Sequence, residues 1–226
     1  ENVFFARWTS NFDCEEETEF WYVICDKFIA IDKLSRNTRN NLRRGLKRCE
    51  VKKVTHQFIM ENAYPIYREA FDNYQGHLKP DTEDEFLNEY SLYNDESVWD
   101  FWVVFENTSS KLIAFSRNKI EYNQCELCTT KFHPKYQRKY YPSEALFYTM
   151  NQYYLDEKKF QYVNDGARSI SHETNIQEFL MQKFKFRKAY CKMHLAYHKN
   201  IKIIVRLIFP FRFIISPIYG TRCTTV

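Results

Sequence analysis

Titratable and polar side chains gather in the segment 165–175, which reads Asp-Gly-Ala-Arg-Ser-Ile-Ser-His-Glu-Thr-Asn. It follows an expected strand near Tyr162 and precedes an expected helix, and ligands bind at such strand-to-helix junctions in α/β folds. Histidine titrates near neutral pH and carboxylates accept protons, so Asp165 and His172 could act as acid–base groups. An ion pair between Asp165 and Arg168 could equally lock the turn as a purely structural feature.

A second chemical group lies in a basic loop before an expected helix that runs from Ser143 to about Lys158. The first turn of a helix attracts anions, because its backbone N–H groups lack partners and the helix dipole is positive there. Pro142 removes one of these N–H donors. The candidate anion-binding residues are Lys135, Arg138, Lys139, Tyr140 and Ser143. The alternative is a plain basic surface turn.

Glycine and cysteine usage excludes several other kinds of site. The chain has only 4 glycines and none are clustered, which argues against a dinucleotide fold or a phosphate-loop NTPase. The 7 cysteines show one C-x-x-C spacing, Cys125 to Cys128, with no second pair to complete a zinc site. We interpret these two as neighbouring strand residues and expect no metal site.

Charge is strongly segregated although the net charge is only +4. The segment 33–53 holds nine Lys or Arg residues and one acid, Glu50, whereas 81–100 holds eight acids and no Lys or Arg. The basic segment predicts a helix with Leu42 and Leu46 on one side. Its other side carries Arg36, Arg39, Arg43 and Lys47. Such a stripe is either a solvated face or a binding face for an RNA, a membrane or the phosphates of a cofactor.

The remaining pattern predicts an α/β chain. Alternating apolar residues predict strands at 99–105, 112–116 and 126–132, with a closing strand at 189–197. A helix is expected over about 57–74, another over 82–93, and a third after the segment 165–175. Residues 20–31 are expected to form a strand pair, or one strand and a turn, and 51–55 a short strand.

This order of elements between Trp99 and Tyr197 resembles the core of the GNAT acyltransferase superfamily, and several short sequence segments resemble the FemAB-like branch. The matching segments are Tyr141-Pro-Ser-Glu-Ala-Leu, residues 165–175 and Lys183-Phe-Lys-Phe-Arg-Lys-Ala-Tyr. The resemblance implies a mixed α+β fold, in which helices flank a central mixed twisted sheet.

The resemblance also implies an acyltransferase that moves an acyl group from acyl-CoA, such as acetyl-CoA, to an amine of a small molecule or peptide. The basic loop would hold the phosphates and Asn175 the pantetheine arm. Asp165 or His172 would supply the base and Tyr190, or alternatively Tyr197, the acid. Arg168 and Ser169 would bind the substrate.

Two alternatives follow from a departure in the loop, where Tyr141 stands at a position that the family fills with glycine. Basic side chains could hold the phosphates directly, or the donor could be an aminoacyl-tRNA, as in FemAB-like enzymes. The helix with Arg36, Arg39, Arg43 and Lys47 would then bind tRNA. A third reading is a non-catalytic module that binds a membrane surface or a protein.

The C-terminal segment 201–226 differs from the rest. Its part 201–219 is mostly aliphatic and aromatic, but three cations and two prolines argue against a spanning helix. An interfacial membrane segment fits, and so does a protein contact. We expect one domain over 1–200 followed by this segment. Free thiols favour a cytoplasmic location, with peripheral attachment at the inner face of the membrane as an option.

Overall fold

The computed structural model describes residues 4–71, 79–168 and 175–208. One eight-stranded sheet organises it, in the order β1-β8-β2-β7-β6-β5-β4-β3. Every neighbouring pair is antiparallel except β6 and β7, which are parallel. The strands are β1(Phe5–Cys14), β2(Phe20–Cys25), β3(Cys49–Val54), β4(Trp99–Glu106), β5(Leu112–Glu121), β6(Gln124–Phe132), β7(Tyr162–Ala167) and β8(Arg187–Tyr197).

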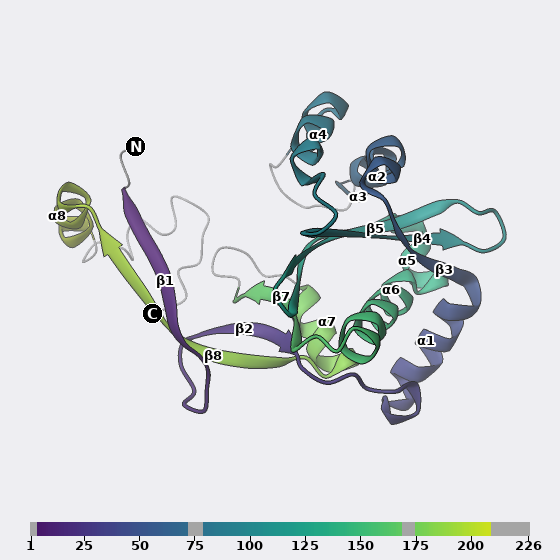
Figure 1. Cartoon of the computed structure of the whole chain (residues 1–226), viewed down its shortest axis with the longest axis horizontal. Helices are drawn as coiled ribbons and strands as arrows, with labels where there is room; N and C mark the ends of the chain where they lie inside the picture. Colours follow the sequence, from purple (N-terminus) through teal and green to yellow (C-terminus); the bar gives the residue numbers. More distant parts are fainter. Residues whose placement is uncertain (1–3, 72–78, 169–174, 209–226) are drawn as a thin grey trace.

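Helices cover both faces of this sheet (Figure 1). The helices are α1(Arg36–Arg48), α2(His56–Asn62), α3(Tyr64–Ala70), α4(Glu83–Tyr90), α5(Pro134–Tyr140), α6(Pro142–Asn151), α7(Asn175–Phe184) and α8(Lys199–Ile208). A π-helical turn, η4(Gln152–Glu157), extends α6, and short 3-10 turns are η1(Ile31–Lys33) and η3(Ser91–Tyr93). The mixed α+β fold expected from the sequence is therefore confirmed.

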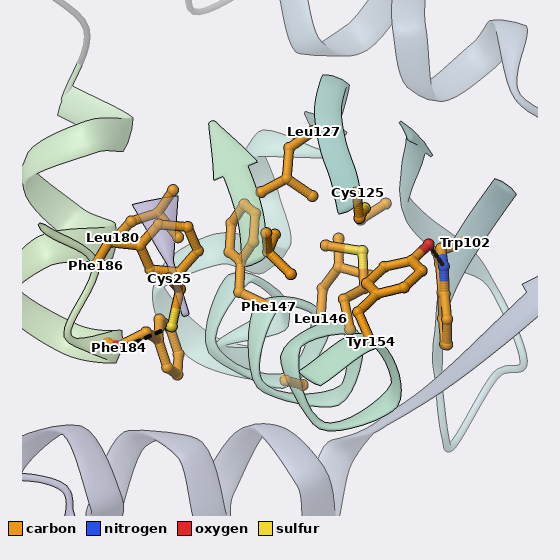
Figure 2. Packing of buried hydrophobic residues seen from close by; sticks show 14 of the residues in the cluster. Cys25, Trp102, Cys125, Leu127, Leu146, Phe147, Tyr154, Leu180, Phe184 and Phe186 are labelled. Carbon is orange, nitrogen blue, oxygen red and sulfur yellow. Dashed lines mark hydrogen bonds between the residues drawn. The ribbon is translucent and has the colours of Figure 1, made fainter. Parts of the chain in front are cut away.

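Two apolar clusters lie on opposite faces of the central strands, because alternate residues of a strand point to opposite sides. On one face α6 and α7 pack on Trp102, Ala114 and Cys125 (Figure 2). On the other face α2, α3 and α4 pack on Phe101, Val103 and Phe115 in a cluster of their own. The strands expected at 99–105 and 112–116 thus bury both of their sides, whereas the strand expected at 126–132 leaves Glu126 and Cys128 exposed.

A buried polar network fixes η4 against the sheet. The Tyr154 hydroxyl donates to the Asp100 carboxylate at 3.0 Å and accepts hydrogen bonds from Trp102 Nε1 at 2.8 Å and Asn118 Nδ2 at 3.2 Å. Lys53 Nζ pairs with the other Asp100 oxygen at 2.6 Å. Because each buried group has a partner, this network specifies the position of the π-helical turn.

Three elements differ from the sequence-based expectation. The helix expected over 57–74 is two helices that break at Ala63, because Pro65 in the first turn of α3 cannot continue α2. The basic loop before Ser143 is a helix, α5, which ends at Tyr141 in the left-handed conformation, with φ of 54°. The strand expected at Tyr162 and Val163 continues to Ala167.

A two-stranded ribbon projects from the body of the molecule (Figure 1). Its strands are β1 and the distal part of β8, which pair from Phe5–Tyr197 to Ser10–Lys192. Only the proximal part of β8 pairs with β2. The sequence did not predict β1, because its side chains are exposed or half-exposed on both faces and lack a buried alternation.

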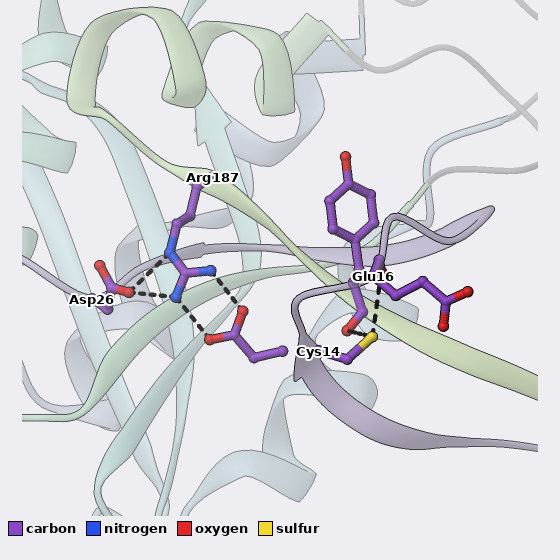
Figure 3. Close-up of polar contacts among 6 residues, drawn as sticks. Cys14, Glu16, Asp26 and Arg187 are labelled. Atoms are coloured by element: carbon purple, nitrogen blue, oxygen red, sulfur yellow. Dashed lines mark hydrogen bonds and ion pairs between the residues drawn. The ribbon is translucent and has the colours of Figure 1, made fainter.

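Arg187 clamps the base of this ribbon (Figure 3). Its guanidinium binds both oxygens of Asp13, at 2.6 and 2.8 Å, and also donates from Nε to Asp26 at 2.9 Å. The Arg187 hydrogen bonds lower the pKa of the Asp13 carboxyl. One side chain of β8 thereby ties the end of β1 to the end of β2.

The helix α8 follows β8 at the far end of the ribbon. It covers the first part of the segment 201–226, and residues 209–226 lie outside the described residues. No helix within the described ranges has the length and apolar character that crossing a membrane requires. The domain boundary at residue 200 stays a prediction.

Candidate functional site

The two parallel strands in the middle of the sheet, β6 and β7, diverge at their carboxyl ends. β6 and β7 pair at Gln124–Tyr162, Cys125–Val163 and Glu126–Asn164. Beyond this point β6 follows β5 to Phe132 and β7 follows β2 to Ala167. The carboxyl ends of diverging parallel strands are where open α/β sheets bind ligands. The segment after β6 and the end of β7 therefore lie on the two sides of this point of divergence.

Asp165 lies on the β7 side of this point of divergence. Burial raises the pKa of its carboxyl to about 7, with a hydrogen bond from Gln177 as a smaller opposing cause. Gln177 Nε2 also donates to the carbonyl oxygen of Ala167 at 3.2 Å, which fixes α7 against the strand end. The next residue, Gly166, has φ of +85° and open space where a Cβ would stand. A carboxyl that titrates near neutral pH can act as a general base.

A second cluster surrounds Trp21 of β2. Lys188 Nζ lies 4.0 Å and the Arg168 guanidinium 4.9 Å from the centroid of the Trp21 ring. The Tyr190 ring stands edge-on to the indole at 6.1 Å. Arg168 also donates to the backbone carbonyl of Glu19, and its amide donates to the carbonyl of Trp21 at 2.8 Å. Arg168 therefore contacts β2, and the alternative ion pair between Asp165 and Arg168 does not occur among the described residues.

These residues share one face of the sheet. Trp21 pairs with Tyr190 and Val23 with Lys188 across β2 and β8, so all four point to the same side. Val23 belongs to the cluster that α6 and α7 cover, and Val163, two residues before Asp165, belongs to it as well. Asp165 and the Trp21 cluster consequently lie on the side of the sheet that α7 covers.

The start of α6 is filled by the protein's own groups. Glu144 is only 5% exposed, and its carboxylate accepts from Ser143 Oγ at 2.9 Å and from Asn41 Nδ2 at 3.5 Å. A carboxylate in the first helical turn satisfies the positive end of the helix dipole. A Cβ on Gly45 would stand 2.7 Å from the Tyr141 carbonyl oxygen, so α1 packs directly on this turn. The Glu144 carboxylate thus compensates the positive end of the α6 dipole, and α1 fills the space beside the first turn of α6.

The two basic segments of the sequence form one continuous surface. Arg48, in the last turn of α1, donates to the carbonyl of Lys139 near the end of α5. Neither helix contains an acidic residue. Within the described ranges no carboxylate pairs with the exposed cations of α1, which are Arg36, Arg43, Arg44, Lys47 and Arg48. We call α1 and α5 together the basic surface.

The structure distributes the predicted site residues over three places. Asp165, Arg168 and Tyr190 lie on the α7 side of the sheet, but within the described chain no hydrogen bond joins Asp165 to Tyr190. Asn175 is the exposed first residue of α7. Ser169 and His172 lie outside the described residues. The anion-binding candidates Lys135, Arg138, Lys139, Tyr140 and Ser143 lie on α5 and the first turn of α6.

Sequence reasoning missed three residues that shape these places: Trp21, Glu144 and Lys188. The pairing of Trp21 with β8 depends on contacts between residues far apart in the chain, which no local pattern reveals. Glu144 carries a local signal, because an acid at the third position of a helix is typical of an N-terminal turn. No cluster of three or more potential metal ligands occurs among the described residues.

Comparison with known proteins identifies the fold. No family model and no curated protein matches the sequence. The structure is similar to that of FemX, with a TM-score of 0.63 and 10% identity over 83% of this chain and 63% of that one. It is also similar to L-PGS from Bacillus licheniformis, with a TM-score of 0.55 and 15% identity over 92% of this chain and 66% of that one.

A third structure of this kind is the C-terminal domain of a lysylphosphatidylglycerol synthetase, as its description has it, from Agrobacterium fabrum. Its TM-score is 0.54, with 12% identity over 92% of this chain and 66% of that one. The chain therefore spans slightly less than two thirds of the length of each of these three structures. The protein has the GNAT/FemAB-like fold that the sequence predicted.

Proposed function

We propose that this protein is an acyltransferase that moves an aminoacyl group from an aminoacyl-tRNA to an amine. The FemAB-like resemblance of the sequence and the similarity to FemX and L-PGS support the acyl-transfer part of the proposal. The observation that carries the choice of donor is the basic surface, where α1 and α5 present many cations and no acid. A polyanion as large as tRNA matches such an extended surface.

The start of α6 supports the same choice. In the GNAT family this turn offers backbone N–H groups to the pyrophosphate of acyl-CoA. Here Glu144 supplies a carboxylate to the turn, Pro142 lacks an N–H, and α1 packs on the Tyr141 carbonyl. A phosphate brought there would face a like charge and the backbone of a neighbouring element.

Asp165 is the base in this proposal. With a pKa of about 7 its carboxylate can take a proton from the acceptor ammonium, so that the free amine attacks the ester carbonyl of the donor. The ester bond to the tRNA ribose oxygen breaks as the amide bond forms, and that oxygen leaves with a proton. Tyr190, beside Trp21, is the candidate acid for this last transfer. Arg168 and Lys188 would hold an anionic group of the acceptor near Trp21.

The first experiment measures binding of bulk tRNA by fluorescence anisotropy over a range of salt concentrations. We expect the double variant Arg36→Glu/Arg43→Glu to bind at least about tenfold more weakly, with a salt slope reduced by about 1 for each lost phosphate contact. The matched control is Lys158→Glu/Lys192→Glu, which makes the same change of charge at exposed residues just after η4 and on the ribbon. This control should bind nearly as well as the wild type.

A calorimetric titration with acetyl-CoA and free CoA tests the competing donor. Micromolar binding of CoA that disappears in Arg138→Glu/Lys139→Glu would overturn the tRNA donor and establish the acyl-CoA enzyme that the GNAT resemblance implies. Equal loss of tRNA binding in both double variants of the first experiment would likewise contradict the assignment, because binding would then follow net charge alone.

A further inference from the structure

The far end of the ribbon exposes large apolar side chains. Phe4 and Phe5 at the start of β1 are 63% and 57% exposed, and Ile203 and Leu207 of α8 are 60% and 67% exposed. β1, the end of β8 and α8 meet at this end of the molecule, far from α1 and α5 (Figure 1). We call these four residues the apolar tip. An exposed apolar group of this size on a projecting two-stranded ribbon, which has little stability of its own, indicates a contact site.

The charge around the apolar tip has one sign only. Residues 4–10 and 193–208 contain no Asp or Glu, but they contain the cations Arg7, Lys199, Lys202 and Arg206. Acidic residues return toward the base of the ribbon, where Glu16 pairs with Lys192 at 3.7 Å and Asp13 binds Arg187. A surface that combines apolar side chains with unmixed positive charge complements an anionic, partly apolar partner.

Among partners with that chemistry, a lipid bilayer fits best. Single strands of nucleic acid are usually bound by stacking of bases on rings, and of the four tip residues Phe4 and Phe5 have rings whereas Ile203 and Leu207 are aliphatic. A second copy of the chain would bring the same positive charges together without a carboxylate to pair them. Exposed Phe and Leu beside Lys and Arg are the combination that settles into the boundary between headgroups and acyl chains.

We infer that the apolar tip docks on an anionic phospholipid surface, with Phe4, Phe5, Ile203 and Leu207 entering the headgroup boundary and the exposed cations Arg7 and Arg206 facing the lipid phosphates. This contact lies beyond the proposed transferase site and is independent of the donor. Since the ribbon holds α1 and α5 away from the tip, the basic surface stays accessible to tRNA while the tip touches a membrane.

Flotation with lipid vesicles tests the inference on the full chain. The two vesicle types contain phosphatidylcholine alone or phosphatidylcholine and phosphatidylglycerol in equal amounts. We expect the protein to float with the anionic vesicles only, and Phe5→Ser/Leu207→Ser to partition at least about tenfold more weakly. The matched control is Leu92→Ser/Tyr122→Ser, because these side chains are 74% and 95% exposed but lie on η3 and the turn between β5 and β6.

Several outcomes would overturn the inference. Unchanged flotation of Phe5→Ser/Leu207→Ser, or equal loss in the control, would remove the tip as the lipid contact. Loss of flotation in Arg36→Glu/Arg43→Glu with the tip variant unaffected would assign the lipid contact to the basic surface. A dimer in sedimentation that becomes a monomer in the tip variant would identify a protein interface instead. Weaker tRNA binding by the tip variant with unchanged flotation would identify an RNA contact.

Discussion

At the scale of single residues, Asp165 combines a cost in stability with a proposed role in catalysis. Its pKa of about 7 lies above its ordinary value of 3.8, so the folded protein keeps a proton that the unfolded chain releases between these pH values. Stability therefore falls as the pH rises through this window and stays reduced above it. A base must be deprotonated to act, so the proposed activity rises over the upper part of the same window.

The variant Asp165→Asn separates the two effects. Above about pH 7 we expect it to be more stable than the wild type by roughly 1–3 kcal/mol, since an amide does not ionise, whereas below about pH 4 the two should unfold alike. Transfer activity should fall at least about a hundredfold. Urea unfolding at several pH values and a transfer assay provide the measurements.

The control for this experiment is Asp156→Asn, at an exposed carboxylate bound to Lys159. Its stability should change little and without the same dependence on pH. If Asp165→Asn keeps full activity, Asp165 is a buried structural carboxyl and the base lies elsewhere. If the variant is destabilised at high pH, the carboxylate is held by favourable contacts that outweigh its burial.

At the residue scale, local order in the sequence predicts where a side chain lies along a strand more readily than what it does. Asp165 was expected at the end of a strand and lies within the last residues of β7, near the point where β6 and β7 diverge, while its role as a base stays a prediction. By contrast, the contact of Arg168 with Trp21 could not be predicted, because Trp21 comes from a strand about 150 positions away in the chain. Local spacing predicts which residues follow a strand but does not predict which strand pairs beside it.

At the scale of elements, the contact between α1 and α6 depends on Gly45. Alanine normally stabilises a helix relative to glycine by about 1 kcal/mol. At this position a Cβ would meet the Tyr141 carbonyl oxygen at 2.7 Å, and the carbonyl belongs to backbone that cannot simply rotate away. We expect Gly45→Ala to destabilise the protein by roughly 1–2 kcal/mol, as overpacking does. Thermal unfolding measures the effect.

Asn40→Ala, on the exposed side of the same helix, is the matched control. It should leave stability unchanged or raise it by a few tenths of a kcal/mol, because only helix propensity changes there. A stabilising Gly45→Ala would mean that α1 stands farther from α6 than the structure places it. The Glu144 turn would then be open to a ligand, and the argument against a phosphate at this point would lose its basis.

The elements themselves were predictable where apolar residues recur at a regular spacing. The strands β4, β5 and β6 carry strong apolar patterns and were predicted. The helix α5 was expected as a loop, because its seven residues are mostly basic or aromatic and none is buried. The ribbon strand β1 was missed for the same reason, since both of its faces meet solvent.

At the scale of the whole molecule, Arg187 determines how firmly the ribbon is attached to the body. It binds Asp13 at one end of β1 and Asp26 after β2, and all three side chains are partly exposed (Figure 3). Solvent screens such a cluster, so Arg187→Ala should lower stability by only about 1 kcal/mol. Its larger effect should be local, because two carboxylates then repel each other where the ribbon joins the sheet.

Hydrogen exchange provides the measurement for this last prediction. In Arg187→Ala we expect faster exchange of the β1 and distal β8 amides, while amides of β4 and β5 exchange as in the wild type. The lowered pKa of Asp13 adds a test of sign. The contact with Arg187 stabilises the folded protein above the ordinary pKa of the Asp13 carboxyl, and this stabilisation is lost as the pH falls through the pKa of the folded state. The difference in exchange between variant and wild type should therefore shrink in acid. Uniformly faster exchange over the whole sheet would contradict a local clamp. Since the apolar tip is carried by this ribbon, a loosened base should also weaken vesicle binding without changing tRNA binding, which would place the two contacts on separate parts of the molecule.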